Sequence, residues 1–141
     1  MSRKELTPRN LKADGACSPG LNWIAPILES GRVPTKNDWE LRPNYYLWAL
    51  GKGYDLPLDI LDYCARLLPA EALQYAADHL TPETLEYCAR ECPRLALAYA
   101  AARLSPETLG YCARLRPAET LQYAAAHLTP ETRIWCEAQV R

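Results

Sequence analysis

Cysteine is the residue type whose spacing in this sequence most resembles a chemical motif. Four of the six cysteines recur at intervals of 24 residues, each directly after an aromatic residue: Cys64, Cys88, Cys112 and Cys136. A thiolate is both a nucleophile and a metal ligand, so a regular series of thiols could mark a catalytic, zinc-binding or disulfide-forming protein. The same series arises if the fold repeats and cysteine fills a small buried position in each repeat.

The geometry of a repeat favours the second explanation. Successive stacked helices lie roughly 8–10 Å apart, whereas the two Cα atoms of a disulfide lie within about 7 Å, so a regular stack excludes a ladder of disulfides. Cys88 and Cys92 could supply two zinc ligands from one helix, but no second pair of Cys or His accompanies them. Cys88 takes a position that alanine takes in the neighbouring half-repeat. We expect buried small residues, and no metal or cofactor.

Three arginines form a second series with the 24-residue spacing, namely Arg66, Arg90 and Arg114. Such a basic row could meet the phosphates of a nucleic acid, one repeat at a time. Asp62 and Glu86 stand four residues before the first two arginines, an order that favours ion pairs within a helix instead. Residues 57–141 hold eight Lys/Arg against eleven Asp/Glu, a balance of −3 that disfavours a polyanionic partner.

Catalytic motifs are absent from the sequence. The two histidines, His79 and His127, lie 48 residues apart and define no dyad with a nucleophile. The chain contains no glycine-rich phosphate loop, no zinc-protease motif and no nucleophile elbow. We therefore expect a protein that is not an enzyme.

The elements that carry these residues are short repeated helices. Aromatic residues recur every twelve positions, at Tyr63, Tyr75, Tyr87, Tyr99, Tyr111, Tyr123 and Trp135, and the residues that follow them alternate, so the full period is 24. Proline opens each half-repeat, at Pro57, Pro69, Pro82, Pro93, Pro106, Pro117 and Pro130, where a helix tolerates it best. Thr81, Ser105 and Thr129 precede three of these prolines as N-cap residues. Eight or nine helical residues are too few to persist alone, so the repeats must stack.

Each half-repeat has one apolar helical face, as in Leu73, Ala76, Ala77 and Leu80. The tyrosines lie near the opposite side, where we expect them to pack between neighbouring helices; an exposed aromatic ladder is the alternative. Arg133 and Glu137 interrupt the pattern in the last half-repeat, which is typical of a terminal helix that faces water.

Residues 1–56 do not repeat. Capping signals predict helices from Thr7-Pro8 to Asp14-Gly15, from Ser18-Pro19 to Ser30-Gly31 and from Pro43 to Leu50, with a loop between Arg32 and Arg42 that holds a helical turn near Trp39. The sequence thus predicts an all-α protein, an α-solenoid of short paired helices. Residues 1–56 would form an N-terminal helical cap and residues 57–141 the tandem repeats, in one cooperative unit.

The repeats resemble a family of short bacterial and phage helical repeats of unknown function, in which an Ala-Leu-x-Tyr-Ala core recurs about every 24 residues. The segments that carry the likeness, within residues 57–136, are LQYAADHLTPETLEYCARECPRLALAYAA and ALAYAAARLSPETL. The prolines at the repeat starts depart from that family's usual form. GACSPGLNW and DWELRPNYYLWAL make the N-terminal half similar to small helical proteins of bacterial mobile elements, some of them immunity proteins.

These observations predict a binding module that acts in the cytoplasm of a bacterial host, because the chain shows neither a leader segment nor a membrane span. Its partner would be another protein. The resemblance favours an inhibitor carried by a phage or mobile element, such as an anti-CRISPR or other anti-defence protein. A toxin-neutralising immunity protein and a nucleic-acid-binding repeat are the alternatives.

Aromatic and basic residues near the end of the N-terminal half are candidates for contact with the partner, since Trp, Tyr and Arg supply most binding energy at protein interfaces. Trp39, Tyr46 and Tyr54 flank predicted loops and are expected to be exposed beside Arg42, whereas Tyr45 and Trp48 are expected to plug the end of the stack. The row of Arg66, Arg90 and Arg114 would extend this surface along the repeats.

Overall fold

The computed structural model describes residues 5–141, which form eleven α-helices and no strand. The expected all-α class is thereby confirmed. The longest helix has twelve residues and the shortest has five. Within the described range, no helix combines the length and the apolar character that a bilayer crossing requires.

The N-terminal segment folds into four helices: α1 (Pro8–Ala13), α2 (Ser18–Glu29), α3 (Lys36–Glu40) and α4 (Pro43–Gly51). Side-chain caps set two of the starts. Thr7 accepts a hydrogen bond from the backbone N–H of Asn10 at 3.1 Å, and Thr35 and Asp38 form a reciprocal capping box at the start of α3. The helical turn expected near Trp39 is therefore a short capped helix.

The repeats form seven further helices: α5 (Leu61–Leu67), α6 (Pro69–Ala76), α7 (Pro82–Glu91), α8 (Pro93–Ala100), α9 (Pro106–Leu115), α10 (Pro117–Ala124) and α11 (Pro130–Gln139). Six of the seven begin at the predicted proline. Thr81, Ser105 and Thr129 act as N-caps, as expected. Helices α6, α8 and α10 each continue into a three-residue 3-10 turn, which reverses the chain before the next helix.

Pro57 is the exception, because α5 starts four residues later than its proline predicts. The carbonyl of Pro57 accepts a hydrogen bond from the Tyr46 hydroxyl at 2.5 Å, and the N–H of Leu61 bonds to the carbonyl of Leu58 instead. A bond from a residue outside the repeats thus replaces the bond that would close the first helical turn.

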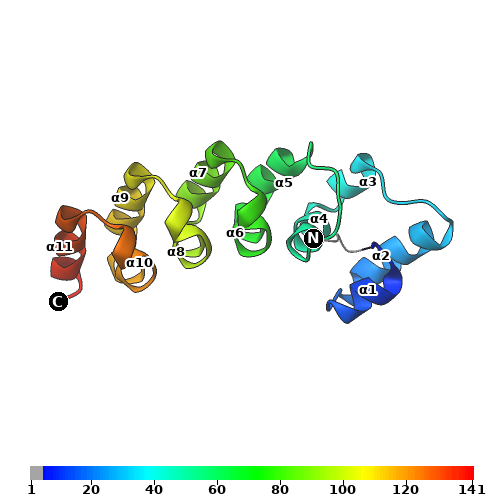
Figure 1. Ribbon diagram of the computed structural model, residues 1–141, viewed down its shortest axis with the longest axis horizontal. Coiled ribbons are helices and arrows are strands. Elements are labelled where there is room, and N and C mark those ends of the chain that lie inside the picture. The colour runs from blue at the N-terminus through cyan, green and yellow to red at the C-terminus, as the bar shows by residue number, and fades with distance from the viewer. Residues whose placement is uncertain (1–4) are drawn as a thin grey trace.

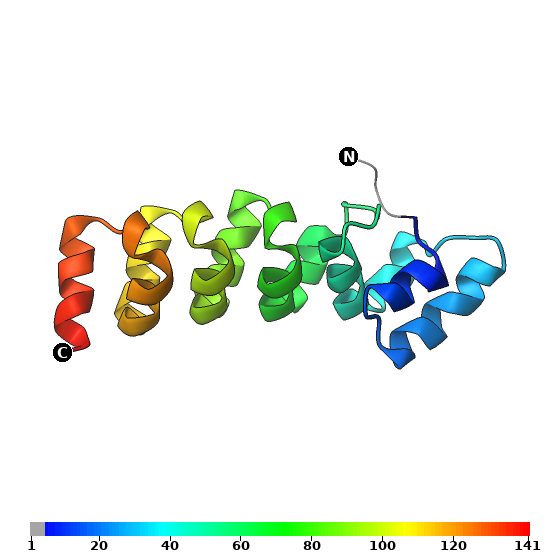
Figure 2. The ribbon, with the colours of Figure 1, turned by 60° about the horizontal axis from the view of Figure 1, so that its bottom comes forward.

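The helices form two rows that run along the molecule (Figure 1). One row holds α4, α6, α8 and α10, and the other holds α5, α7, α9 and α11; each helix packs against the next of its own row and against its chain neighbours in the other. Helix α4 takes the first place in its row, so the N-terminal residues share a core with the repeats. Figure 2 shows α1 and α2 at one end of the rows and α11 at the other.

Small side chains let the rows pack closely. The predicted apolar face of Leu73, Ala76, Ala77 and Leu80 is buried, with at most 7% of any of these residues exposed. A close backbone approach lies between α4 and α6, where a Cβ atom on Gly51 would stand 2.0 Å from the carbonyl oxygen of Tyr75. Only glycine fits at this contact.

Hydrogen bonds between an acid and a threonine join successive helices of one row. The hydroxyl of Thr84 on α7 donates to the carboxylate of Asp62 on α5, and that of Thr108 on α9 donates to Glu86 on α7. Both threonines are at most 2% exposed. A buried hydroxyl needs such a partner, so each bond fixes how one repeat sits on the next.

The third link of this series is missing. Gly110 takes the position of Asp62 and Glu86, and Thr132 on α11 takes the position of the two threonines. A shallow groove of about 290 Å³ opens at this place, lined by Gly110, Thr132 and Trp135 among others. A Cβ atom at Gly110 would meet no other atom within 4 Å, so the backbone has room for a side chain.

Replacing Gly110 with glutamate should restore the link and stabilise the protein. Removal of glycine from a helix interior contributes about 1 kcal/mol, and the new bond to Thr132 should add roughly 1 kcal/mol. Urea unfolding of the wild type, Gly110→Glu and Gly110→Ala separates the two effects, because alanine supplies only the first. Equal stability of the two variants would contradict the proposed link.

Candidate functional site

The most regular surface of the molecule is a series of arginine and aromatic side chains on α5, α7, α9 and α11, which we call the arginine–tyrosine row. Its members lie three residues apart on each helix and comprise Tyr63, Arg66, Tyr87, Arg90, Tyr111, Arg114 and Trp135. Tyr63 is 52% exposed and Trp135 41%, whereas Tyr87 is half-buried. The tyrosines therefore form an exposed ladder, and the expectation that they pack between helices is wrong for most of them.

Cation–π contacts join the members of the row across helices. The guanidinium of Arg66 lies 4.7 Å from the ring centroid of Tyr87, and that of Arg90 lies 5.2 Å from the centroid of Tyr111. These two arginines thus reach forward to the aromatic ring of the next helix in the row. These contacts hold the flexible arginine side chains in place, with polar N–H groups left at the edge of each stack.

The predicted ion pairs within helices form in one case of two. Arg66 Nε lies 3.1 Å from Asp62, as expected. The hydrogen bond from Thr84, with Arg66 also beside the carboxylate, holds the pKa of Asp62 below its usual value. Glu86 instead accepts hydrogen bonds from the Ser105 N–H at 2.9 Å and from Thr108, which draws it away from Arg90.

The expectation that Trp39, Tyr46 and Tyr54 are exposed is wrong. The exposed fractions of their side chains are 1%, 0% and 3%. The Trp39 ring packs edge-on against Trp23 and Tyr46, at centroid distances of 5.2 and 6.1 Å. Each tyrosine hydroxyl has a partner, since that of Tyr46 donates to Pro57 and that of Tyr54 donates to Asp14 at 2.6 Å. These three residues belong to the core that joins the N-terminal helices to the repeats.

The aromatic residues of α4 differ in burial from what the sequence predicts. Tyr45 and Trp48, predicted as core, are half-buried, while the neighbouring Tyr46 and Leu47 are buried completely. The helix is apolar on nearly every side, so its sequence gives no sign of which face turns inward. Arg42 is exposed as expected, with its guanidinium 5.9 Å from the centroid of Trp23.

The cysteine series lies inside the protein, as predicted. Cys64, Cys88, Cys112 and Cys136 are 0% exposed, and each is a free thiol. Burial raises the pKa of Cys64, Cys88 and Cys112 to about 11. A buried thiol with a raised pKa is a poor nucleophile near neutral pH, so these residues pack rather than react. Within residues 5–141, no three His, Cys, Asp or Glu side chains gather as a metal site would require.

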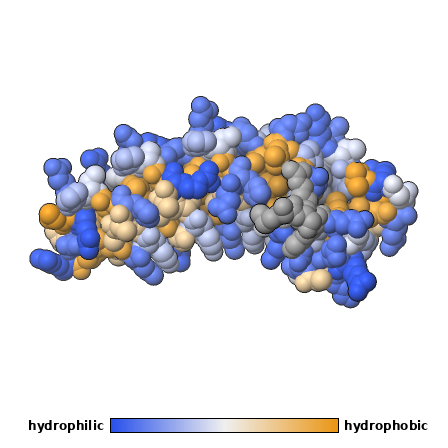
Figure 3. Space-filling model, viewed as in Figure 1, coloured by the Kyte–Doolittle hydropathy of each residue, from blue (hydrophilic) through white to orange (hydrophobic). Residues whose placement is uncertain are grey.

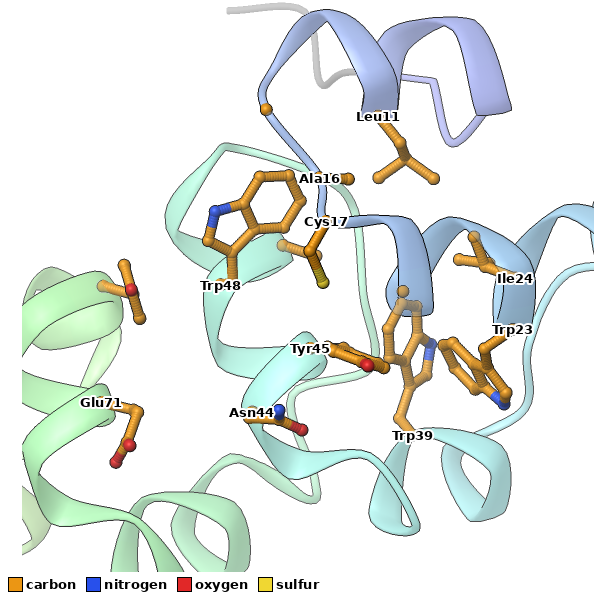
Figure 4. Close-up of a pocket in the computed structure, with 14 residues that line it drawn as sticks. Leu11, Ala16, Cys17, Trp23, Ile24, Trp39, Asn44, Tyr45, Trp48 and Glu71 are labelled. Atoms are coloured by element: carbon orange, nitrogen blue, oxygen red, sulfur yellow. The ribbon is translucent and has the colours of Figure 1, made fainter.

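A second candidate site lies where the N-terminal helices meet the repeats. A cavity of about 420 Å³ opens between α1, α2, α4 and α6, and its walls include Trp23, Tyr45, Trp48 and Glu71 (Figure 4). Sequence reasoning missed it, because Glu71 lies more than twenty residues from the nearest of these aromatic residues along the chain. No local motif signals a contact that only the fold creates.

Tyr46→Ala should destabilise the protein, since it removes a buried ring and leaves the Pro57 carbonyl without its donor. We expect a loss of about 3–5 kcal/mol in the free energy of unfolding. Arg42→Ala, at an exposed site in the same helix region, should change that free energy by less than about 0.5 kcal/mol. Urea unfolding of both variants tests the assignment, and a Tyr46→Ala variant as stable as the wild type would refute it.

Stability should also depend on pH through the buried thiols. Their folded-state pKa of about 11 lies above the usual value of 9.0, so the folded protein keeps these protons to higher pH than the unfolded chain does. Their contribution is therefore complete below pH 9 and is lost as the pH rises toward 11. A triple variant with alanine at positions 64, 88 and 112 should lose less stability over this range, as measured by thermal melting, and an identical loss would contradict the burial.

No protein-family model, curated protein or solved structure matches the chain. A function for the arginine–tyrosine row has to be argued from its residues and their contacts. Apolar surface also interrupts the charged surface along the length of the array, as one face shows in Figure 3.

Proposed function

We propose that this protein is a non-catalytic module that binds another protein through the arginine–tyrosine row. The observation that carries the proposal is the series of aromatic rings on α5, α7, α9 and α11, three of which are at least 37% exposed, with an exposed arginine beside the ring on each of the first three helices. Tyrosine, tryptophan and arginine dominate the binding energy of protein interfaces, because they combine large apolar area with directional hydrogen bonds. A row of them on a packed scaffold is a surface suited to a protein partner.

The contacts within the row support tight binding. Arg66 and Arg90 are already stacked on the rings of Tyr87 and Tyr111, so fewer side-chain rotamers are lost when a partner docks. Among the described residues, Arg90 and Arg114 have no carboxylate within salt-bridge distance. Their guanidinium groups are available to carboxylates of the partner, for which bidentate pairing gives both energy and orientation.

A non-catalytic role agrees with the state of the reactive groups. The four repeated thiols are buried, and the carboxylates of Asp62 and Glu86 accept hydrogen bonds that link the repeats. His79 and His127 lie at equivalent positions two repeats apart. The thiols and the two carboxylates thus serve packing and alignment, whereas both histidines are exposed.

The partner that we favour is a component of a bacterial defence system, which would make the protein an inhibitor of the anti-CRISPR or a similar anti-defence kind. A toxin neutralised by an immunity protein is the alternative. The support for this part is the resemblance of the N-terminal half to small proteins of mobile elements, carried by GACSPGLNW and DWELRPNYYLWAL.

Single-stranded nucleic acid is the rival partner, because bases stack on aromatic rings and arginines meet phosphates in such complexes. Two features oppose it. Arg66 is paired with Asp62, and the repeats carry a net charge of −3. A nucleic-acid-binding surface is usually basic over its whole extent.

Capture from a bacterial lysate, with and without nuclease, distinguishes the two partners. We expect a protein to be retained after nuclease treatment. Purified partner should then bind the Arg90→Ala, Tyr111→Ala double variant about 30-fold or more weakly, as two lost hot-spot contacts predict. Tyr99→Ala, Tyr123→Ala is the matched control, because these tyrosines are similarly exposed but lie on α8 and α10.

Two results would contradict the proposal. Recovery of nucleic acid alone, with binding that weakens steeply as salt rises, would favour the rival. Equal losses of affinity in the row variant and in the control would show that the row is not the contact surface.

A further inference from the structure

The cavity at the start of the array has a wall of aromatic rings. Trp23 comes from α2, Tyr45 and Trp48 from α4, and Tyr75 from α6, so three separate helices bring these rings to one hollow. Figure 4 shows Trp48 and Tyr45 on the helix that borders the cavity, with Trp23 beside Trp39 on one side. The ring centroids of Trp23 and Tyr45 lie 6.0 Å apart at an interplanar angle of 38°, so these two rings also pack against each other.

The charge of the cavity is negative. Glu71 on α6 is the one acidic residue of the lining, and no lysine, arginine or histidine lines it. This carboxylate is half-buried, and it forms no hydrogen bond or ion pair with the rest of the described chain. Figure 4 shows Glu71 on α6, beside the helix that carries Tyr45 and Trp48. A carboxylate and aromatic rings that line one cavity both attract a cation, because the faces of the rings are also electronegative.

Two of these rings already contact cations of the protein itself. Arg42 lies 5.9 Å from the centroid of Trp23, and the Lys52 ammonium lies 5.8 Å from that of Trp48. Neither basic side chain lines the cavity. The protein thus uses Trp23 and Trp48 for cation–π contacts with side chains that lie outside the cavity lining.

The chemistry of the lining selects one type of cation. A metal ion requires several oxygen or nitrogen ligands, and this cavity offers a single carboxylate. A primary ammonium is strongly hydrated and loses much on entering an apolar site. A quaternary ammonium holds its water weakly and presents methyl groups that fit against aromatic faces and against apolar residues such as Leu11 and Ile24.

We propose that this cavity binds the quaternary ammonium group of a small free molecule. A volume of about 420 Å³ falls within the range of small-molecule sites and exceeds that of the ammonium group alone. The cavity shares no residue with the arginine–tyrosine row, and its helices α1, α2, α4 and α6 carry no member of that row. The site is therefore separate from the proposed protein interface, and the inference does not depend on it.

The test uses choline and its neutral carbon isostere, in which a tert-butyl group replaces the trimethylammonium group. Three of the four tryptophans line the cavity, so tryptophan fluorescence reports binding, and calorimetry measures the affinity independently. Choline should bind about tenfold more tightly than the isostere, since only the charge differs. Equal affinities, or no binding of either compound, would overturn the proposal.

Two pairs of variants test which residues contact choline. In each pair, a cavity residue is compared with the residue at the equivalent position of another repeat. Glu71→Gln should weaken choline binding about fivefold to tenfold, whereas Glu119→Gln, which is equally half-buried and lies two repeats further along, should not change it. Tyr75→Leu should weaken binding, and Tyr99→Leu should leave it unchanged. Both tyrosines are partly exposed, so these variants keep the core intact. Equal effects within either pair would overturn the assignment.

A further experiment distinguishes a small free ligand from a trimethylammonium group carried on a protein side chain. A peptide that carries trimethyllysine is titrated beside choline under the same conditions. The proposal expects choline to bind at least as tightly as the peptide, because the contacts described involve the ammonium group alone. Much tighter binding of the peptide would overturn the assignment to a free molecule.

Discussion

Close packing of short helices on one another is the constraint on which the whole structure depends. Most helices of the array have eight to ten residues, too few to persist alone in water. They are stable because they bury small and apolar residues, mostly leucine, alanine and cysteine, against neighbouring helices. Small residues are needed where backbones approach, and this explains why cysteine alternates with alanine at one buried position. The thiols mark the period of the fold and not a reaction.

The same constraint decides what is left on the surface. One face of each helix packs against its neighbours, and the opposite face remains at the surface. Because the sequence repeats every 24 residues, the surface residues line up, with aromatic rings on α5, α7, α9 and α11 and arginines on the first three of these helices. The acid–threonine bonds hold successive helices of this row in register. At the N-terminal end the repeat is replaced by helices rich in aromatic residues, and a cavity opens between them and α6. The arginine–tyrosine row thus arises from the regularity of the array, and the cavity arises where the repeat pattern stops.

The sequence predicts the structural features that recur in every repeat. Prediction from sequence fails where one tertiary contact determines the local structure. Proline spacing predicts six helix starts because the same local signal appears each time, but it misplaces the start of α5, where Tyr46 takes the carbonyl of Pro57. The inward face of α4 could not be predicted, because apolar residues surround that helix. Arg66, Arg90 and Arg114 were predicted as a row, whereas the stacking of Arg66 and Arg90 on the next helix's rings depends on tertiary geometry. Glu71 and Trp23 meet one cavity only because α2 and α6 border the same helix.

Amide hydrogen exchange of the free protein tests most directly whether packing between neighbours holds these helices. The account predicts the slowest exchange in α7 and α8, which have helices on both sides along the array, and much faster exchange in α11, which has neighbours on one side only. Protection should fall toward the C-terminal end in steps that follow whole helices. Similar exchange rates in α7, α8 and α11, near those of short isolated peptides, would contradict the account.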